Sequence, residues 1–599
     1  MRRENTEFSS EFLSAAFIIG VTGRILREPP AQNAHLLGQQ LMDAPETRER
    51  GGPENGGADR IVDKERKKAE KHAGERQDPP AFLAPIILHL DDNRVAYPDN
   101  QENGRSDNDT CKVHEYLFVS ADKGTQKLLI IRYLCTETNL HHTMKTITEP
   151  SRNIPVRAEV DVLVVGGGPS GIMAARGAAG DGLHVMLLES RGYLGGNLTI
   201  GLPILAFLDI NGKQCIRGYA QDFVDRLAVR GAASGHKRCA LHMSLTIIDP
   251  EESKNVALEL MEESGVEVLM SVFVADVIKE GDTVKGVVIE SKNGREAILA
   301  RTVIDCSGDG DVAARAGALI YKGDEKGGMQ PPTLMYSMRG VDVGALRKAL
   351  VERHEEFDMD RMPPEQFREG KFITVGLRRQ IRKAESAGIR LPVARTILIT
   401  GLRPDEIWVN MTRVGGIDAT LPESYTRGEI AARAQIKEVN EYLRRFVPGF
   451  GSAWMDKVAP FLGIRESRQI GCEYMLTGED ILESRRFSDC IAVAGYPVDI
   501  HHSVGADCTM LFARDNYDIP YRCLVPKGLH HLLVSGRCAG YTHEAMASAR
   551  VMSTCMAVGQ AAGTAARLAL KQKVEPARVD VDSLRAELIA EGAYLGQLG

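Results

Sequence analysis

The amino-acid sequence predicts an α/β protein of more than one domain, and three observations lead to this expectation. From about residue 160 onward, apolar strand-like runs alternate with helical patterns, the order typical of a sheet covered by helices. One apolar strand leads through a glycine-rich turn into the alanine-rich helix 172–179. With 599 residues, 43% of them hydrophobic, the chain is long enough to bury more than one core.

The composition restricts the class of partner. A formal net charge of -7 gives no general attraction for nucleic acids, so we expect a small-molecule substrate. No run approaches the roughly 20 apolar residues that a membrane-spanning helix needs. The 11 cysteines are scattered singly, without CxxC pairs, which is typical of reduced thiols. We therefore expect a cytoplasmic protein without a membrane span or a metal site.

Residues 1–155 differ from the rest of the chain. Glu46 to Asp78 is a charged run with few apolar residues, a composition typical of disorder. Lys127 to Tyr133 is nevertheless consistent with a short strand. Two interpretations remain open, an accessory extension or a spurious segment upstream of a natural start at Met144. The second is favoured because the first strong strand follows Met144 after a short polar lead.

The glycine-rich turn has the spacing of a dinucleotide site. Val160–Val165 runs directly into Gly166, Gly168 and Gly171. The first glycine permits the turn, the second lets backbone approach a pyrophosphate, and the third lets helix and strand pack closely. The next strand ends at Glu189, about 20 residues further on, where a carboxylate accepts hydrogen bonds from ribose. A glycine-rich turn without a ligand is the alternative. The strand before the turn, the helix after it and the acidic residue at the expected distance favour a Rossmann-type site.

Other elements follow from hydrophobic spacing. We expect strands at 266–274, 284–289 and 302–304, and helices at 255–264, 427–446 and 582–591. The nucleotide-binding domain would then comprise residues 156–335 and 485–575. Residues 336–484 would form an inserted mixed α/β substrate or cap domain, and 576–599 a C-terminal helical segment.

The fingerprint does not distinguish FAD from NAD, but three later segments favour FAD. Leu194–Thr199 contains paired glycines that can bring backbone amides to a flavin. Thr302–Asp311 is a strand ending in a small-residue turn, whose acids are metal ligands only if further donors exist. Leu532–Arg537 is a strand followed by a long small-residue helix through Gly559 and Gly563. The N-terminus of that helix would stabilise negative charge on the reduced cofactor.

From about Val160 to Leu595 the chain resembles the FAD-dependent oxidoreductases related to the flavin core of heterodisulfide reductase, that is, to the flavin-bearing polypeptide of that enzyme. More distant similarity extends to fumarate reductase flavoproteins and to tRNA-modifying flavoenzymes of the glucose-inhibited-division type. The resemblance rests on the segments 164–171, 303–317, 463–468 and 536–563. It implies FAD as the cofactor, bound by a glutathione-reductase-like Rossmann domain.

The resemblance also implies which residues hold the cofactor. The ADP half would be held by Gly166, Gly168, Ser170, Gly171 and Glu189. Residues along the rest of FAD would be Gly195, Gly196, Asn197, Gly308, Asp309, Gly536, Arg537, Gly559 and Gly563. Val274, expected at the end of a strand, would contact adenine through its backbone.

The chain departs from the heterodisulfide reductases in one respect. It lacks their clustered cysteines, so we expect no iron–sulfur centre. It also lacks a second complete glycine fingerprint with a redox cysteine pair, which disfavours a disulfide reductase with its own nicotinamide domain.

Candidate catalytic residues must lie near the flavin ring, because flavin performs the redox step while the protein orients substrate and moves protons. His543 and Glu544 precede the last long helix, where histidine would act as acid or base; helix capping is the alternative. Arg465 and Arg468 would clamp a substrate carboxylate, unless they form a structural salt-bridge network. Arg550 would contact substrate or cap a neighbouring loop.

The sequence therefore predicts an FAD-dependent oxidoreductase that transfers a hydride between flavin and a small organic, possibly carboxylated, substrate. Two alternatives stay open: a tRNA-modifying flavoprotein, which needs a basic face, and a non-catalytic flavin protein that relays electrons. The substrate, the electron partner, covalent attachment of FAD and homo-oligomerisation are not determined by the sequence.

Overall fold

The fold is described from a computed structural model of the chain, which describes residues 112–122, 125–135 and 146–596. The chain divides into two units, Met1–Glu149 and Pro150–Gly599. In the first unit, β1 (Lys112–Asp122) pairs antiparallel with β2 (Thr125–Cys135), which includes the expected strand 127–133. The charged run 46–78 and the expected start at Met144 lie outside the described residues.

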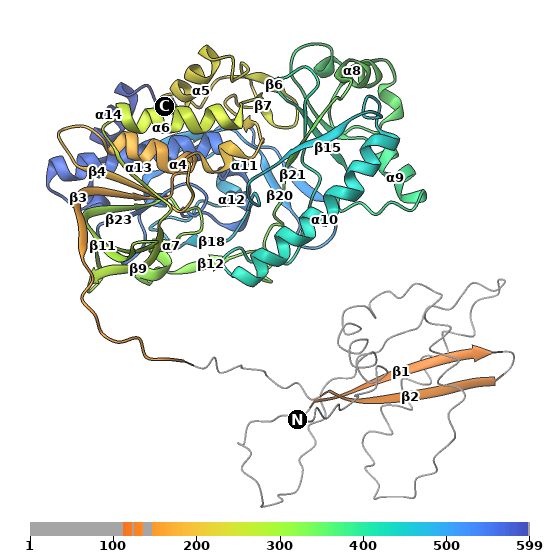
Figure 1. The fold of residues 1–599 in the computed structure, drawn as a ribbon, viewed down its shortest axis with the longest axis horizontal. Helices are drawn as coiled ribbons and strands as arrows, with labels where there is room; N and C mark the ends of the chain where they lie inside the picture. The colour runs from red at the N-terminus through yellow and green to blue at the C-terminus, as the bar shows by residue number, and fades with distance from the viewer. Residues whose placement is uncertain (1–111, 123–124, 136–145, 597–599) are drawn as a thin grey trace, which may run out of the picture. The chain divides into compact units, whose positions relative to one another are not determined.

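A seven-stranded sheet organises the second unit (Figure 1). Strands β8, β4, β3, β11 and β23 lie parallel in this order, and β10 and β9 continue antiparallel from β11. The bounds are β3 Val156–Val165, β4 Val185–Glu189, β8 Glu267–Met270, β9 Phe273–Glu280, β10 Thr283–Ser291, β11 Gly294–Asp305 and β23 Leu532–Val534. Because β11 is long, its first half pairs with β10 and its last residues with β23.

Helices cover this sheet, and two of them pack unusually closely. α4 (Pro169–Ala178) lies against β3 and β4, and α13 (Met552–Gln572) lies against α4 (Figure 1). A Cβ atom on Gly563 would stand 2.0 Å from the Ala174 carbonyl oxygen, so only glycine allows this approach. The neighbouring helices are α5 Tyr219–Val229, α6 Pro250–Glu263, α7 Asp311–Ala316 and α14 Val581–Ala590.

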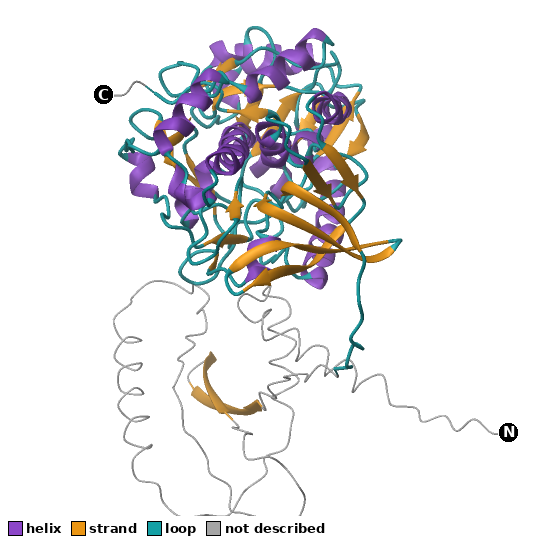
Figure 2. Ribbon diagram, turned by 90° about the vertical axis from the view of Figure 1, so that its left-hand side faces the viewer, coloured by secondary structure: helices purple, strands orange, loops and turns teal. Residues whose placement is uncertain are grey.

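A second, antiparallel sheet lies in the middle of the chain, in the order β14-β15-β16-β13-β17. Its strands are β13 Tyr336–Arg339, β14 Ile373–Gly376, β15 Thr396–Thr400, β16 Ile407–Val409 and β17 Trp454–Val458. The helices of this part are α8 Val343–Glu352, α9 Arg378–Ser386 and α10 Pro422–Phe446. This part has its own hydrophobic core, which also recruits residues from 200–247 and Tyr496. Figure 2 shows the helices and strands of the second unit in purple and orange.

The remaining elements are short. The paired strands are β5 Ile204–Leu205 and β6 Lys237–Cys239 with β7 Met243–Thr246, β12 Ile320–Lys322 with β18 Arg468–Ile470, β19 Cys490–Ala494 with β22 Tyr517–Pro520, and β20 Val498–His501 with β21 Cys508–Leu511. The short helices are α11 Gly478–Leu482 and α12 His543–Ala549, with single 3-10 turns at η1 Gly196–Thr199, η2 His354–Glu356, η3 Pro364–Phe367, η4 Tyr521–Leu524 and η5 Pro576–Arg578.

Two expected elements are each broken in the structure. The expected strand 266–274 is two strands, β8 and β9, because Ser271 adopts a left-handed conformation (φ 59°) between them. Val274 therefore lies near the start of β9 instead of ending a strand. The expected long helix after Tyr541 is divided into α12 and α13, because Val551 is extended (φ -65°, ψ 149°).

No helix among the described residues combines the length and the apolar character needed to cross a membrane.

Candidate functional site

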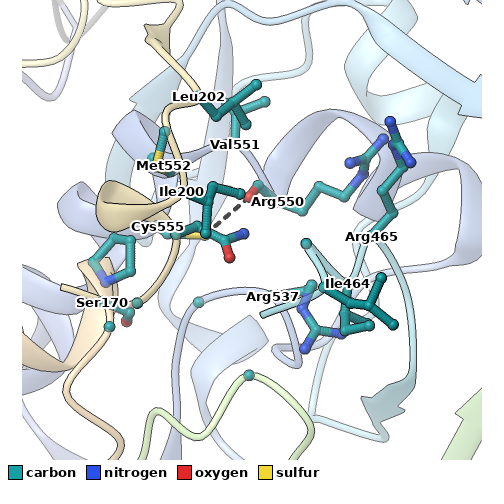
Figure 3. A pocket seen from close by; sticks show the side chains of 18 of the residues that line it. Ser170, Ile200, Leu202, Ile464, Arg465, Arg537, Arg550, Val551, Met552 and Cys555 are labelled. Carbon is teal, nitrogen blue, oxygen red and sulfur yellow. Dashed lines mark hydrogen bonds between the residues drawn. The ribbon is translucent and has the colours of Figure 1, made fainter. Parts of the chain in front are cut away.

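A cavity of about 440 Å³ begins at the carboxyl ends of the parallel strands, within the range of about 300–1,000 Å³ typical of ligand pockets. It is lined at one end by the glycine turn after β3 and by residues after β4 and β11, and at the other by side chains of the middle sheet. Figure 3 shows the part between these ends. In open α/β sheets this edge is the usual place for a ligand.

The glycine turn has the geometry expected for a phosphate site. A Cβ atom on Gly171 would lie 1.7 Å from the Gly166 carbonyl oxygen, so helix and strand pack as the spacing predicts. At Gly168, by contrast, an added Cβ would meet only the Gly196 Cα at 4.0 Å, which leaves an open side toward the cavity. The N-terminus of α4 has no side-chain cap there. Uncapped N–H groups at a positive helix end bind anions such as a pyrophosphate.

Glu189 lies at the end of β4 beside this turn. Its Oε2 accepts a hydrogen bond from the Gly167 N–H at 2.8 Å, and its Oε1 accepts from the Arg191 N–H at 2.9 Å and the Ser190 hydroxyl at 3.0 Å. The residue is 4% exposed and borders the cavity. These contacts fix the carboxylate against the glycine turn, where the second strand was expected to place it.

The turn after β11 is fixed by two carboxylates with different roles. Asp305 accepts hydrogen bonds from the N–H groups that begin α7, at 2.9 and 3.0 Å, and burial raises its pKa. Asp309 borders the cavity and accepts from Arg537 Nη2 at 2.7 Å and from the Ser467 hydroxyl at 2.6 Å. Burial alone would raise the pKa of Asp309, but Arg537 and Ser467 lower it below the ordinary value. The turn is therefore held in place before any ligand binds.

Most of the expected cofactor residues border the cavity. These are Gly166, Gly168, Ser170, Glu189, Gly196, Asn197, Val274, Gly308, Asp309, Gly536 and Arg537. Gly171, Gly195, Gly559 and Gly563 do not. A Cβ on Gly195 would lie 2.6 Å from Thr199 Cγ2, and one on Gly559 would lie 2.2 Å from the Ser170 carbonyl oxygen. Gly559 and Gly563 let α13 approach α4, and their expected place along the cofactor stays a prediction.

Three of the expected catalytic residues also lie away from the cavity wall. The Nδ1 atom of His543 is 2.8 Å from Glu466 Oε1, and Glu544 is exposed at the start of α12. Arg468 donates to the Asp309 carbonyl at 3.1 Å and to Asp311 at 2.9 Å. Arg468 therefore supports the turn after β11, and His543 forms an ion-pair contact behind the wall. Desolvation lowers the pKa of His543, but Glu466, together with Glu544 and Asp324, raises it, so that the net pKa is raised.

Arg465 and Arg550 do border the cavity, and their guanidinium groups lie side by side (Figure 3). Arg465 donates to the Pro331 carbonyl, and Arg550 donates to the Asp499 carbonyl at 3.1 Å and to Gln330 Oε1 at 3.2 Å. Within the described part of the chain, neither forms an ion pair with a carboxylate. Burial first, and then the neighbouring Arg550, lower the pKa of Arg465 to about 9.

A polar group that is not among the expected catalytic residues lies beside these arginines. Asp499 Oδ2 lies 3.3 Å from His501 Nε2 and accepts from the Tyr496 hydroxyl at 3.2 Å. Arg413 Nη1 lies 3.3 Å from His501 Nδ1. Because a guanidinium only donates, His501 Nδ1 is the acceptor and Nε2 carries the hydrogen. Burial, followed by Arg465, lowers the pKa of His501 to about 3, so the ring is neutral.

His242 is a second buried imidazole on the wall. Its ring stacks on Tyr496 with centroids 6.2 Å apart, and its Nδ1 lies 3.5 Å from Cys239 Sγ. Burial is the main cause that lowers the pKa of His242 to about 4. No spacing in the sequence connects His242 with the group around Asp499. Among the described residues, no cluster of three or more His, Cys, Asp or Glu side chains is arranged to hold a metal ion.

A model of the FAD dependent oxidoreductase family matches residues 161–588. Ferredoxin–NADP reductase of Nocardioides sp. is 29% identical over 110 residues, which are 18% of this chain and 33% of that relative. Thiamine thiazole synthase of Methanococcus aeolicus is 30% identical over 167 residues, 26% of this chain and 57% of the relative. The chain thus matches less than two thirds of the length of either relative.

The matches to solved structures are distant. A geranylgeranyl bacteriochlorophyll reductase-like protein from Thermoplasma acidophilum is 14% identical, with coverage of 73% of this chain and 84% of that one and a TM-score of 0.36. The myxobacterial chondrochloren halogenase is 13% identical, with coverage of 74% and 84% and a TM-score of 0.38. The family match covers the glycine turn, and the open side at Gly168 and the uncapped α4 suit the pyrophosphate of FAD.

Proposed function

The chain belongs to the family of FAD-dependent oxidoreductases, and on this premise we propose that it transfers a hydride between FAD and a small organic acid whose carboxylate is held by Arg465 and Arg550. FAD supplies the two-electron redox chemistry when bound, and the protein supplies binding, orientation and control of charge.

The observation that carries this proposal is the pair of adjacent guanidinium groups. Two half-buried like charges without a direct ion pair to a carboxylate are unfavourable, because each loses hydration and repels the other. Two buried donors nearby, Arg550 Nε and Gln330 Nε2, also have no hydrogen-bond partner. A carboxylate would accept from the arginines with charge-assisted geometry and would offset the repulsion. Asp499 offsets only part of the positive charge of Arg465, Arg550 and the nearby Arg413, and an anionic substrate would offset more of it.

The cofactor would occupy the other end of the cavity. Its pyrophosphate would lie at the N-terminus of α4, with Glu189 near the ribose and the turn at Gly308 below it. The N-terminus of α13 also reaches the cavity through Val551 and Met552, and this helix of 21 residues has no side-chain cap. Its positive end favours negative charge in the cavity.

The polar group around Asp499 would complete the substrate end. Tyr496 and His242 border the cavity, where both can form hydrogen bonds with a substrate. Because His242 is neutral, it adds no positive charge to that of the arginines. Residues 336–484 would act as the substrate or cap domain, since β14 and β15 contribute to the wall. A closer relation to the flavin core of heterodisulfide reductase remains part of this proposal.

Purification and anaerobic titration test the proposal. The holoenzyme should show a flavin spectrum, and a panel of reduced organic acids, or of oxidised acids added to the dithionite-reduced enzyme, should change it. Arg465→Met should weaken the response at limiting acid, whereas Arg468→Met should alter FAD retention instead. Protein that binds no FAD even when FAD is added contradicts the cofactor assignment. A flavin that responds to a protein partner but to no organic acid favours a non-catalytic electron relay.

A further inference from the structure

The cavity wall contributed by the middle sheet is apolar. Ile373 and Val375 of β14 and Ile397 of β15 border the cavity. Val375 and Ile397 are directly opposite each other in the antiparallel register, so their side chains point to the same face of the sheet. Leu241 adds to this surface. The wall is thus mainly apolar where β14 and β15 face the cavity, with Arg395 and Asn410 at its margins.

The β20–β21 hairpin connects this wall with the arginine pair. Asp499 and Met510 are opposite each other in the hairpin, and both border the cavity. The Asp499 carbonyl accepts a hydrogen bond from Arg550 at 3.1 Å. Met510, which belongs to the apolar surface, is therefore opposite the residue that Arg550 contacts. A single ligand can contact both the arginines and this surface.

Arg395, a cation beside this apolar wall, is already paired. It borders the cavity from the residue before β15, and its Nη1 lies 3.0 Å from Asp360 Oδ2. Its other terminal nitrogen contacts the Cys508 thiol. A second substrate carboxylate at this end would share Arg395 with the like charge of Asp360, or would lose its hydration against Ile373 and Ile397.

We propose that the substrate is a monocarboxylic acid with an extended apolar body, an inference that rests on the proposed function and specifies its substrate. The carboxylate binds Arg465 and Arg550, and the hydrocarbon lies along Met510, Val375 and Ile397. Burial of one methylene group against such a surface strengthens binding by about 4-fold. Affinity should therefore rise with chain length until the wall is covered.

A calorimetric titration of the holoenzyme with straight-chain acids from acetate to octanoate tests this inference without requiring turnover. Affinity should increase by about 2- to 4-fold per methylene group, since burial is incomplete at an open wall. Adipate should bind at least about 10-fold more weakly than hexanoate, because its second carboxylate meets the apolar wall. Equal affinity across the series, or tighter binding of adipate, overturns the inference.

Two substitutions test which residues contact the hydrocarbon chain of the ligand and which contact its carboxylate. Ile397→Thr should flatten the dependence on chain length, whereas Ile430→Thr, at a position that is 66% exposed on α10, should not. Arg465→Met should remove the preference for octanoate over octanol and keep the dependence on length. If Arg465→Met instead changes the flavin spectrum and leaves acid binding intact, the arginine serves the cofactor and the inference is wrong.

The calorimetric and spectroscopic results separate this inference from the proposed function. Binding that depends on chain length without any change in the flavin spectrum contradicts hydride transfer but supports the monocarboxylate site. A flavin that responds with equal affinity to acids of every length, or with higher affinity to adipate than to hexanoate, supports the proposed function and contradicts the further inference.

Discussion

Gly171 lies so close to Gly166 that a Cβ atom on it would stand 1.7 Å from the Gly166 carbonyl oxygen. Gly171→Ala must therefore push α4 away from β3, at a cost of roughly 3 kcal/mol, near the upper end of overpacking. We expect lower thermal stability and loss of bound FAD, measured by the unfolding midpoint and by the ratio of flavin to protein absorbance. Gly235→Ala is the control, because nothing lies within 4 Å of its added Cβ.

Gly559 distinguishes a packing role from a cofactor role. Its added Cβ would lie 2.2 Å from the Ser170 carbonyl oxygen, inside the contact between α13 and α4. Gly559→Ala should destabilise the FAD-free protein by roughly 1–3 kcal/mol. Urea unfolding of the FAD-free protein measures this. If the variant has unchanged stability without FAD but binds FAD less tightly, Gly559 contributes to the cofactor site instead.

Arg465 and Arg468 should affect different ligands, although they are close in sequence. Arg465→Met removes one member of the unpaired arginine pair, and we expect about 10- to 100-fold weaker binding of the acid, the range for hydrogen bonds to charged groups. Arg468→Met removes the contacts to Asp309 and Asp311, so FAD should dissociate more readily while the affinity for acid in FAD-saturated enzyme changes little. Equal effects of both variants on acid affinity would contradict the separation.

His543 should make stability depend on pH. Glu466 raises its pKa above the unfolded value of about 6.5, so the ion pair contributes fully below that pH and is lost as pH rises through the folded pKa. The substitution His543→Asn should therefore lower the free energy of unfolding more at pH 5.5 than at pH 8.5. The urea unfolding midpoints of the variant and the original protein measure this difference. His530→Asn is the control, since its pairing with Glu575 is exposed and solvent-screened. A loss that is equal at both pH values contradicts this role.

Local sequence reasoning succeeded where one short segment contains the whole physical cause. The turn from β3 into α4 and the acid that ends β4 follow from the spacing of a few residues, and the structure places them as expected. It failed at Val274 and after Tyr541, because the backbone conformations of Ser271 and Val551 interrupt patterns that read as continuous. Apolar periodicity does not report such single-residue breaks.

The sequence by itself determined the dinucleotide turn and the α/β architecture, because a glycine turn between strand and helix acts through neighbouring atoms. The preference for FAD over NAD came from three later segments and from the family resemblance. Only the tertiary structure decided which polar side chains face the cavity. Arg465, Asp499 and Arg550 come from separate segments, and they meet only because a hairpin and the junction of two helices converge there. His543, by contrast, was expected near the flavin, but in the structure it contacts Glu466 and does not line the cavity.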